Sequence, residues 1–189
     1  MSGGCCCSGN RSCCAPKPER RKVEIDFLYL DLTVCNRCMG TDASLEAAIA
    51  DVSGILKAAG FDVVVNKVNI TSKELAIEHQ LVSSPTIRVN GRDIEPDVKE
   101  SPCESCADLC GGDSDCSVDC RVWTHDGQEY TVPPRELIVN AILREVYSGA
   151  PSGPSAPAAP AAAQGGSGEY RLPHNLETFF DLKDSGRQE

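Results

Sequence analysis

Apolar residues are concentrated between residues 22 and 147, where their spacing predicts alternating strands and helices. VEIDFLYL (23–30) and FDVVVNKVNI (61–70) are each typical of a β-strand. Between them, apolar residues recur every three or four positions and predict a helix with one buried stripe, formed by Leu45, Ala48, Ile49, Val52, Ile55, Leu56 and Ala59. Thr41 or Asp42 is expected to cap the start of this helix, and Gly60 to end it.

Shorter elements complete this region. Ser72 is expected to open a helix over 72–80, and Pro85 precedes a strand, TIRVN. Asn90-Gly91 predicts a two-residue hairpin that pairs this strand with residues 92–95. A second hairpin is expected at 125–127, between RVW and QEYTV, before a last helix that starts at Pro133-Pro134 and runs to Tyr147.

Composition divides the chain into four regions. Residues 1–21 predict a disordered, cysteine-rich tail, and residues 22–147 a folded α/β domain with a cysteine-rich insert at 97–120. Residues 148–168 have the Pro/Ala/Gly composition of a linker. Residues 169–189 hold a short apolar segment, whose patch within 172–182 is expected either to fold back on the domain or to bind a protein partner. That patch is formed by Leu176, Phe179 and Phe180.

Charge and cysteine content narrow the function. The 189 residues carry a formal net charge of -10, which disfavours nucleic acid as a partner. No apolar run approaches the ~20 residues that span a membrane, and the N-terminal sequence lacks the apolar core of a secretory signal. We therefore expect a cytoplasmic protein, in which the 12 cysteines are metal ligands or redox groups rather than a disulfide framework.

Two motifs carry a resemblance over residues 22–147. Cys35-Asn36-Arg37-Cys38 follows the first predicted strand, and Ser83-Ser84-Pro85-Thr86 enters the third. With the order of elements around them, they resemble the thioredoxin-like superfamily. The resemblance implies a mixed sheet with flanking helices and a cis Pro85 packed beside the CxxC motif.

A narrower resemblance adds no activity. The chain contains CxRC, SPTIRVNGRDIE, ESPCESCADLCG, CRVW and a terminal LPxNLxxFF patch. This combination is similar to an uncharacterised bacterial, cysteine-rich, thioredoxin-like family that is described as a domain of unknown function. The family offers a fold and no established reaction.

The CxxC pair is the first candidate site. By resemblance, Cys35 is the thiol that attacks a disulfide, Cys38 the thiol that resolves the mixed disulfide, and Pro85 completes the catalytic set. The surroundings, TVCNRCMG, differ from the WCGPC of thioredoxins. A helix that begins near Thr41 would leave Cys35 before its first turn, which weakens the support of the helix dipole for a thiolate, and Arg37 would supply some positive charge instead. The alternative is that the pair forms half of a structural zinc site.

The insert is a candidate metal site. Its cysteines, spaced C-x2-C-x3-C-x5-C-x3-C, are Cys103, Cys106, Cys110, Cys116 and Cys120. The stretch from Asp93 to Cys120, both included, contains nine acidic residues and one lysine. The acidic residues raise thiol pKa values, which disfavours a nucleophile and favours thiolates neutralised by a metal. Four of the five thiolates would close a tetrahedral zinc site and leave one over. The alternatives are a disulfide-linked loop that exchanges with the CxxC pair and a loop without a fixed partner.

The N-terminal tail is a second candidate for metal binding. Its five thiols suit zinc, Cu(I), Hg(II) or As(III), and belong to Cys5, Cys6, Cys7, Cys13 and Cys14. The tail is basic and the insert acidic, so we hypothesise that the tail carries an ion to the insert or to the CxxC pair. The alternative is an extension without function.

The remaining residues point to no further site. His79, His125 and His174 stand in no motif with an acid or a nucleophile, and Trp123 is expected to be a packing residue. Three hypotheses follow. The first is binding or transfer of soft metal or metalloid ions, with thiol–disulfide exchange at the CxxC pair. The others are a cytosolic thiol–disulfide oxidoreductase and a zinc-stabilised interaction module.

Overall fold

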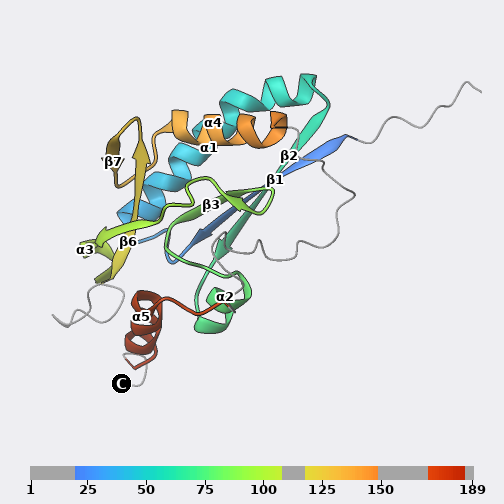
Figure 1. Ribbon diagram of the computed structural model, residues 1–189. Coiled ribbons are helices and arrows are strands. Elements are labelled where there is room, and N and C mark those ends of the chain that lie inside the picture. Colours follow the sequence, from blue (N-terminus) through green and yellow to red (C-terminus); the bar gives the residue numbers. More distant parts are fainter. Residues whose placement is uncertain (1–19, 108–117, 149–169, 186–189) are drawn as a thin grey trace, which may run out of the picture.

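The computed structural model describes residues 20–107, 118–148 and 170–185, which form an α/β fold around a mixed four-stranded sheet (Figure 1). The strand order is β2-β1-β3-β4. β1 (Arg21–Tyr29) and β2 (Phe61–Asn69) run parallel over their whole length. β3 (Thr86–Val89) is antiparallel to β1, and β4 (Arg92–Asp93) is antiparallel to β3. The strands predicted over 23–30, over 61–70 and after Pro85 are confirmed, and the return arm predicted over 92–95 is limited to Arg92–Asp93.

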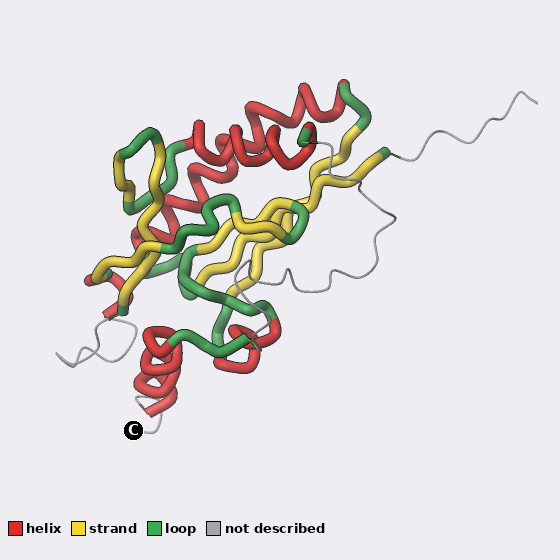
Figure 2. Tube along the Cα trace, in the orientation of Figure 1, coloured by secondary structure: helices red, strands yellow, loops and turns green. Residues whose placement is uncertain are grey.

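Helices cover both faces of this sheet. α1 (Asn36–Ala58) and α4 (Arg135–Tyr147) pack together on one face, and α2 (Lys73–Glu78) and α5 (His174–Ser185) lie on the other (Figures 1 and 2). Alternate residues of β1 explain this division, because Val23, Ile25 and Phe27 are buried with α1 and α4 while Leu28 belongs to the opposite cluster. That opposite cluster also contains every cysteine of the described residues.

The start of α1 differs from the sequence prediction. The helix begins at Asn36, and Cys35 is its N-cap, with Sγ accepting a hydrogen bond from the backbone N–H of Cys38 at 3.3 Å. The expected cap at Thr41 or Asp42 is wrong, because the cysteine sulfur fills the role that a serine or aspartate oxygen usually takes. The CxxC motif therefore occupies the first turn of the helix, where the helix dipole favours a thiolate.

Both predicted hairpin turns are confirmed by backbone conformation. Asn90 and Gly91 have φ of 50° and 79°, and Asp126 and Gly127 have φ of 50° and 77°. Two successive positive φ values are those of a type I′ turn, which matches the twist of paired strands. Trp123, between the two turns, is fully buried, as expected of a packing residue.

A second sheet occupies the region that the sequence presents as a cysteine-rich interruption. β5 (Lys99–Pro102), β6 (Asp119–His125) and β7 (Gln128–Tyr130) form it in this order, and α3 (Glu104–Ala107) follows β5. The strands expected around 121–123 and 128–132 are present as β6 and β7, whereas β5 and α3 are not expected from the sequence. β5 has the sequence KESP and no buried residue, so its pairing with β6 leaves no apolar alternation to detect.

The C-terminal apolar patch lies in α5, which packs against the domain. Leu176, Phe179 and Phe180 are each 1% exposed or less, and they join the buried cluster that contains the cysteines. The segment therefore folds back on the domain. Several predictions made from the sequence concern residues outside the described ranges: the tail with Cys5, Cys6, Cys7, Cys13 and Cys14, the insert residues Cys110 and Cys116, and most of the linker.

Candidate metal centre

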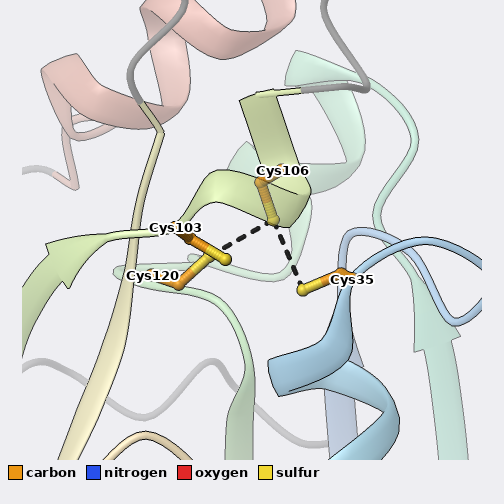
Figure 3. Close-up of side chains that lie close together, drawn as sticks. All are labelled: Cys35, Cys103, Cys106 and Cys120. Carbon is orange, nitrogen blue, oxygen red and sulfur yellow. Dashed lines mark hydrogen bonds between the residues drawn. The ribbon is translucent and has the colours of Figure 1, made fainter.

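Four buried cysteine sulfurs meet at one point of the structure (Figure 3). They come from Cys35, Cys103, Cys106 and Cys120, and all four Sγ atoms lie within 4.8 Å of one another. Cys106 Sγ is 3.3 Å from Cys35 Sγ and 3.3 Å from Cys120 Sγ. No side chain of the four is more than 6% exposed, and no disulfide joins any two of the described cysteines.

Three of these cysteines are brought together by local folding of the insert. The pairing of β5 with β6 sets Ser101 opposite Cys120, and the backbone N–H of Cys103 donates to the carbonyl of Val118 at 2.9 Å. The chain then turns into α3, where the N–H of Cys106 donates to the carbonyl of Cys103 at 3.1 Å. Two cysteines three residues apart on a tight turn present both sulfurs to the same side.

The fourth cysteine comes from the start of α1. Cys35 lies at the end of the loop after β1, and Asn36 next to it donates from Nδ2 to Ser105 Oγ in α3 at 3.1 Å. The side chain of Arg37 extends to backbone carbonyls of β5 and β6. The beginning of α1 is thus held directly against the insert, so that the two candidate sites expected from sequence form one site.

Hydrogen bonds between the four sulfurs shift the pKa values of the thiols in opposite directions. Hydrogen bonds donated by Cys103, and then by Cys106 and Cys120, hold the pKa of Cys35 far below its usual range. Hydrogen bonds from Cys106 and Cys120 lower the pKa of Cys103 to about 7. The pKa values of Cys106 and Cys120 are raised, in both cases mainly through the hydrogen bond to Cys103. The arrangement therefore favours a thiolate at Cys35 with Cys106 and Cys120 protonated, while Cys103 titrates near neutral pH.

Cys38 lies beside the four sulfurs without belonging to the group. It is fully buried, and its pKa is raised mainly by the hydrogen bond to the Cys35 sulfur and by burial. Its Sγ is 3.7 Å from Ser84 Oγ. The Ser84–Pro85 peptide bond is cis, as expected, and it lies in the loop that contacts the CxxC motif. Of the candidate catalytic set, Cys35 alone is among the four.

A buried arginine supports this loop and the strand that carries Cys120. Arg121 is fully buried, forms two 2.8 Å bonds to the carboxylate of Asp93, and donates to Thr86 Oγ1 at 2.9 Å. Its backbone N–H donates to the carbonyl of Ser84 at 2.8 Å. Its guanidinium also stacks on Trp123. This role carries no signal in the sequence, because the pairing of Arg121 with Asp93 is formed by tertiary structure.

The insert prediction is partly corrected by this geometry. Sequence analysis assigned a four-thiolate site to the insert alone, whereas the group takes three insert cysteines and Cys35. Spacing within the insert could not reveal this, because the fourth ligand comes from a distant element. Within the part of the chain that the structure describes, this is the one group of three or more cysteine, histidine or carboxylate side chains arranged to hold a metal ion. His79, His125 and His174 are not in it.

The comparison with protein families gives one match. A family model described as a domain of unknown function (DUF2703) matches residues 23–142, more than half of the chain. The chain belongs to the DUF2703 family. No curated protein and no solved structure matches it. The matched region of this DUF2703 protein contains all four cysteines of the group, while α5 lies beyond it. Among the described residues, no helix has the length and apolar character to cross a membrane.

Proposed function

We propose that this DUF2703 protein binds one soft metal or metalloid ion through Cys35, Cys103, Cys106 and Cys120. The observation that carries the proposal is the convergence of four buried sulfurs within 4.8 Å of one another. A tetrahedral zinc site with Zn–S bonds of ~2.3 Å has sulfurs about 3.8 Å apart. The cysteine group needs only a small expansion of its 3.3 Å contacts to reach that separation.

The donor set favours particular ions. Thiolates select zinc, Cu(I) and other thiophilic ions over magnesium, calcium and manganese. Four thiolates fill every position of a tetrahedral ion and leave none for a substrate, which is typical of a closed zinc site. Zinc is therefore the first ion to test. Hg(II) and As(III) remain candidates, because they can bind a subset of the same sulfurs.

The proposal includes a thioredoxin-like arrangement of residues 22–147, preceded by a tail at 1–21 and followed by a linker at 148–168. Three features favour it: a CxxC motif in the first turn of α1, the parallel β1–β2 pair that α1 connects, and the cis Pro85 next to the motif. Delivery of the ion by the cysteines of the tail is part of this proposal. A reducing compartment such as the cytoplasm would keep all of these thiols available for the ion.

A second candidate function is thiol–disulfide exchange at Cys35 and Cys38. The observation that favours it is the position of Cys35 as the N-cap of α1, with a lowered pKa and the Cys38 N–H donating to its sulfur. Both side chains are 0% exposed, however, so that a protein disulfide has no access to them in this arrangement. Because both thiols are buried, metal binding is better supported than thiol–disulfide exchange.

The third hypothesis, an interaction module that uses the apolar patch within 172–182, has less support. Leu176, Phe179 and Phe180 pack inside the protein's own buried cluster. These side chains are therefore occupied within the chain, which favours α5 as part of the fold over α5 as a docking segment.

A matched pair of variants tests the proposal. The background is the full chain with the five tail cysteines changed to serine, purified anaerobically, so that tail thiols cannot contribute. We expect about one zinc ion per chain, held against a competing chelator, and a loss of affinity of at least tenfold in Cys35→Ser. Cys38→Ser removes an equally buried thiol outside the group and should retain the ion.

The same set of proteins distinguishes metal binding from thiol–disulfide exchange. A model-disulfide reduction assay on the same proteins measures thiol exchange. Absence of zinc from the background protein, or equal losses in Cys35→Ser and Cys38→Ser, would contradict the metal proposal. Disulfide reduction that depends on both cysteines without metal binding would establish the oxidoreductase instead.

A further inference from the structure

Arg37, inside the CxxC motif, connects α1 to the insert by four hydrogen bonds. Its Nη1 donates to the Ser101 carbonyl at 3.3 Å, to Ser101 Oγ at 3.0 Å and to the Cys120 carbonyl at 3.0 Å. Its Nη2 donates to the Pro102 carbonyl at 2.7 Å. One planar guanidinium is therefore shared between β5 and β6.

The acceptors are placed next to the cysteines of the metal centre. Pro102 directly precedes Cys103, and the Cys120 carbonyl belongs to a ligand itself. Arg37 follows Cys35 by two residues and lies in the same first turn of α1. A single side chain thus joins the first turn of α1, which Cys35 caps, to the backbone beside Cys103 and Cys120.

We propose that Arg37 is the positioning residue of this metal centre, and that it sets the distance between Cys35 and the insert sulfurs. The inference rests on the proposed metal-binding function. Arginine suits the task because its rigid fork donates several bonds in one plane, which a lysine ammonium does not reproduce. Its positive charge also offsets the excess negative charge of four thiolates around a divalent ion.

A positioning role differs from a general contribution to stability in what it predicts. If Arg37 only stabilised the fold, its loss would lower the melting temperature and leave a bound ion in the same environment. If it positions Cys35, its loss changes the ligand field of the ion, because one of the four sulfurs is no longer held at the right distance.

Cobalt(II) binding tests this difference in the full chain with the five tail cysteines changed to serine. The variants are Arg37→Gln and Arg37→Lys. The control is Arg135→Gln, which removes an exposed ion pair between α4 and Asp51 of α1, away from the metal centre.

We expect Arg37→Gln to bind cobalt at least tenfold more weakly and to lose intensity in the tetrahedral ligand-field bands. Arg37→Lys should recover part of the affinity through its charge, and Arg135→Gln should match the parent. A parent-like cobalt spectrum and affinity in Arg37→Gln would overturn the proposal.

A metal-free measurement keeps the inference separate from the proposed function. Diamide, a mild thiol oxidant, takes two electrons and two protons from two neighbouring thiols, is itself reduced to the hydrazine, and leaves the two sulfurs joined as a disulfide. In the metal-free chain with Cys38 also changed to serine, we expect diamide to join Cys35 to an insert cysteine, as identified by peptide mapping. Arg37→Gln should slow this reaction at least fivefold. Failure of the parent protein to bind any ion would refute the proposed function alone, whereas an unchanged cross-linking rate in Arg37→Gln would refute the positioning role alone.

Discussion

The Sγ atoms of Cys35 and Cys106 lie 3.3 Å apart, although 71 positions separate the two residues in the chain. Cys35 belongs to the CxxC motif and Cys106 to the insert, so that this contact unites a candidate redox pair with a candidate metal site. Any chemistry of one is therefore coupled to the other. An ion held by the four sulfurs removes Cys35 from disulfide exchange, and a disulfide at Cys35 removes one ligand from the ion.

The buried pair of Arg121 and Asp93 is expected to stabilise the fold around Cys120. Asp93→Asn leaves the guanidinium, which is 0% exposed, without its charged partner. Breaking a buried ion pair at one partner is strongly destabilising, so we expect a loss of about 3 kcal/mol in the free energy of unfolding. Chemical denaturation measures it, and Glu129→Gln, which breaks the exposed ion pair with Lys99, serves as the control with a loss of less than about 1 kcal/mol. Equal effects of the two substitutions would contradict this account.

α5 is expected to protect the cysteine group from solvent. Phe180→Ala removes a ring that is 1% exposed within the cluster that contains the cysteines. The lost packing should lower the free energy of unfolding by about 3 kcal/mol. In the metal-free protein, alkylation of the group by iodoacetamide should become at least tenfold faster. Glu177→Ala changes an exposed residue of the same helix and should alter neither quantity, and a parent-like alkylation rate in Phe180→Ala would show that α5 does not limit access.

Tyr170 provides a pH-dependent probe of the same docked segment. Its hydroxyl donates to the Leu81 carbonyl at 2.6 Å, and burial raises its pKa to about 12. The unfolded chain releases this proton near pH 10, two units before the folded chain does, so Tyr170 disfavours the folded state as the pH rises from about 10 to about 12. Phenolate absorbance is titrated in the parent and in Tyr170→Phe, and the difference between the two curves reports the ionisation of Tyr170. The midpoint of this difference curve should lie close to pH 12. A midpoint near 10 would show that the hydroxyl is not held in this position.

Metal uptake should release protons. The raised pKa values of Cys106 and Cys120 keep both thiols protonated at neutral pH in the metal-free protein, whereas an ion binds thiolates. Zinc binding at pH 7 should therefore release about two protons, with a further fraction from Cys103, whose pKa is about 7. Calorimetry in buffers of different ionisation enthalpy counts them, and affinity should fall as the pH is lowered. Binding without proton release would mean that the ion is not held by these thiols.

Much of the fold follows from local sequence signals. Segments rich in apolar residues predict β1 and β2, and Asn90-Gly91 and Asp126-Gly127 predict the turns that the structure contains. The start of α1 does not follow, because a cysteine sulfur caps it in place of an oxygen. α5 was missed although Leu176, Phe179 and Phe180 have the spacing of a helical stripe and follow Pro173 closely.

The composition of the candidate metal centre depends on tertiary structure. Sequence spacing identifies Cys103 and Cys106 as close neighbours, and the insert as rich in thiols. It carries no signal that joins Cys35 to them in place of Cys38, since both cysteines of the CxxC motif are equivalent in the sequence. The choice comes from the direction of α1, whose first turn presents Cys35 to the insert and turns Cys38 toward Ser84.

X-ray absorption at the zinc edge tests the central claim most directly. The sample is the anaerobically purified chain with the five tail cysteines changed to serine and loaded with one equivalent of zinc. Four cysteine ligands predict a first shell of about four sulfurs at ~2.3 Å, and about three sulfurs with one lighter atom in Cys106→Ser. A first shell of nitrogen and oxygen in the parent, or a sulfur count that Cys106→Ser leaves unchanged, would contradict the assignment of these four cysteines as a metal centre.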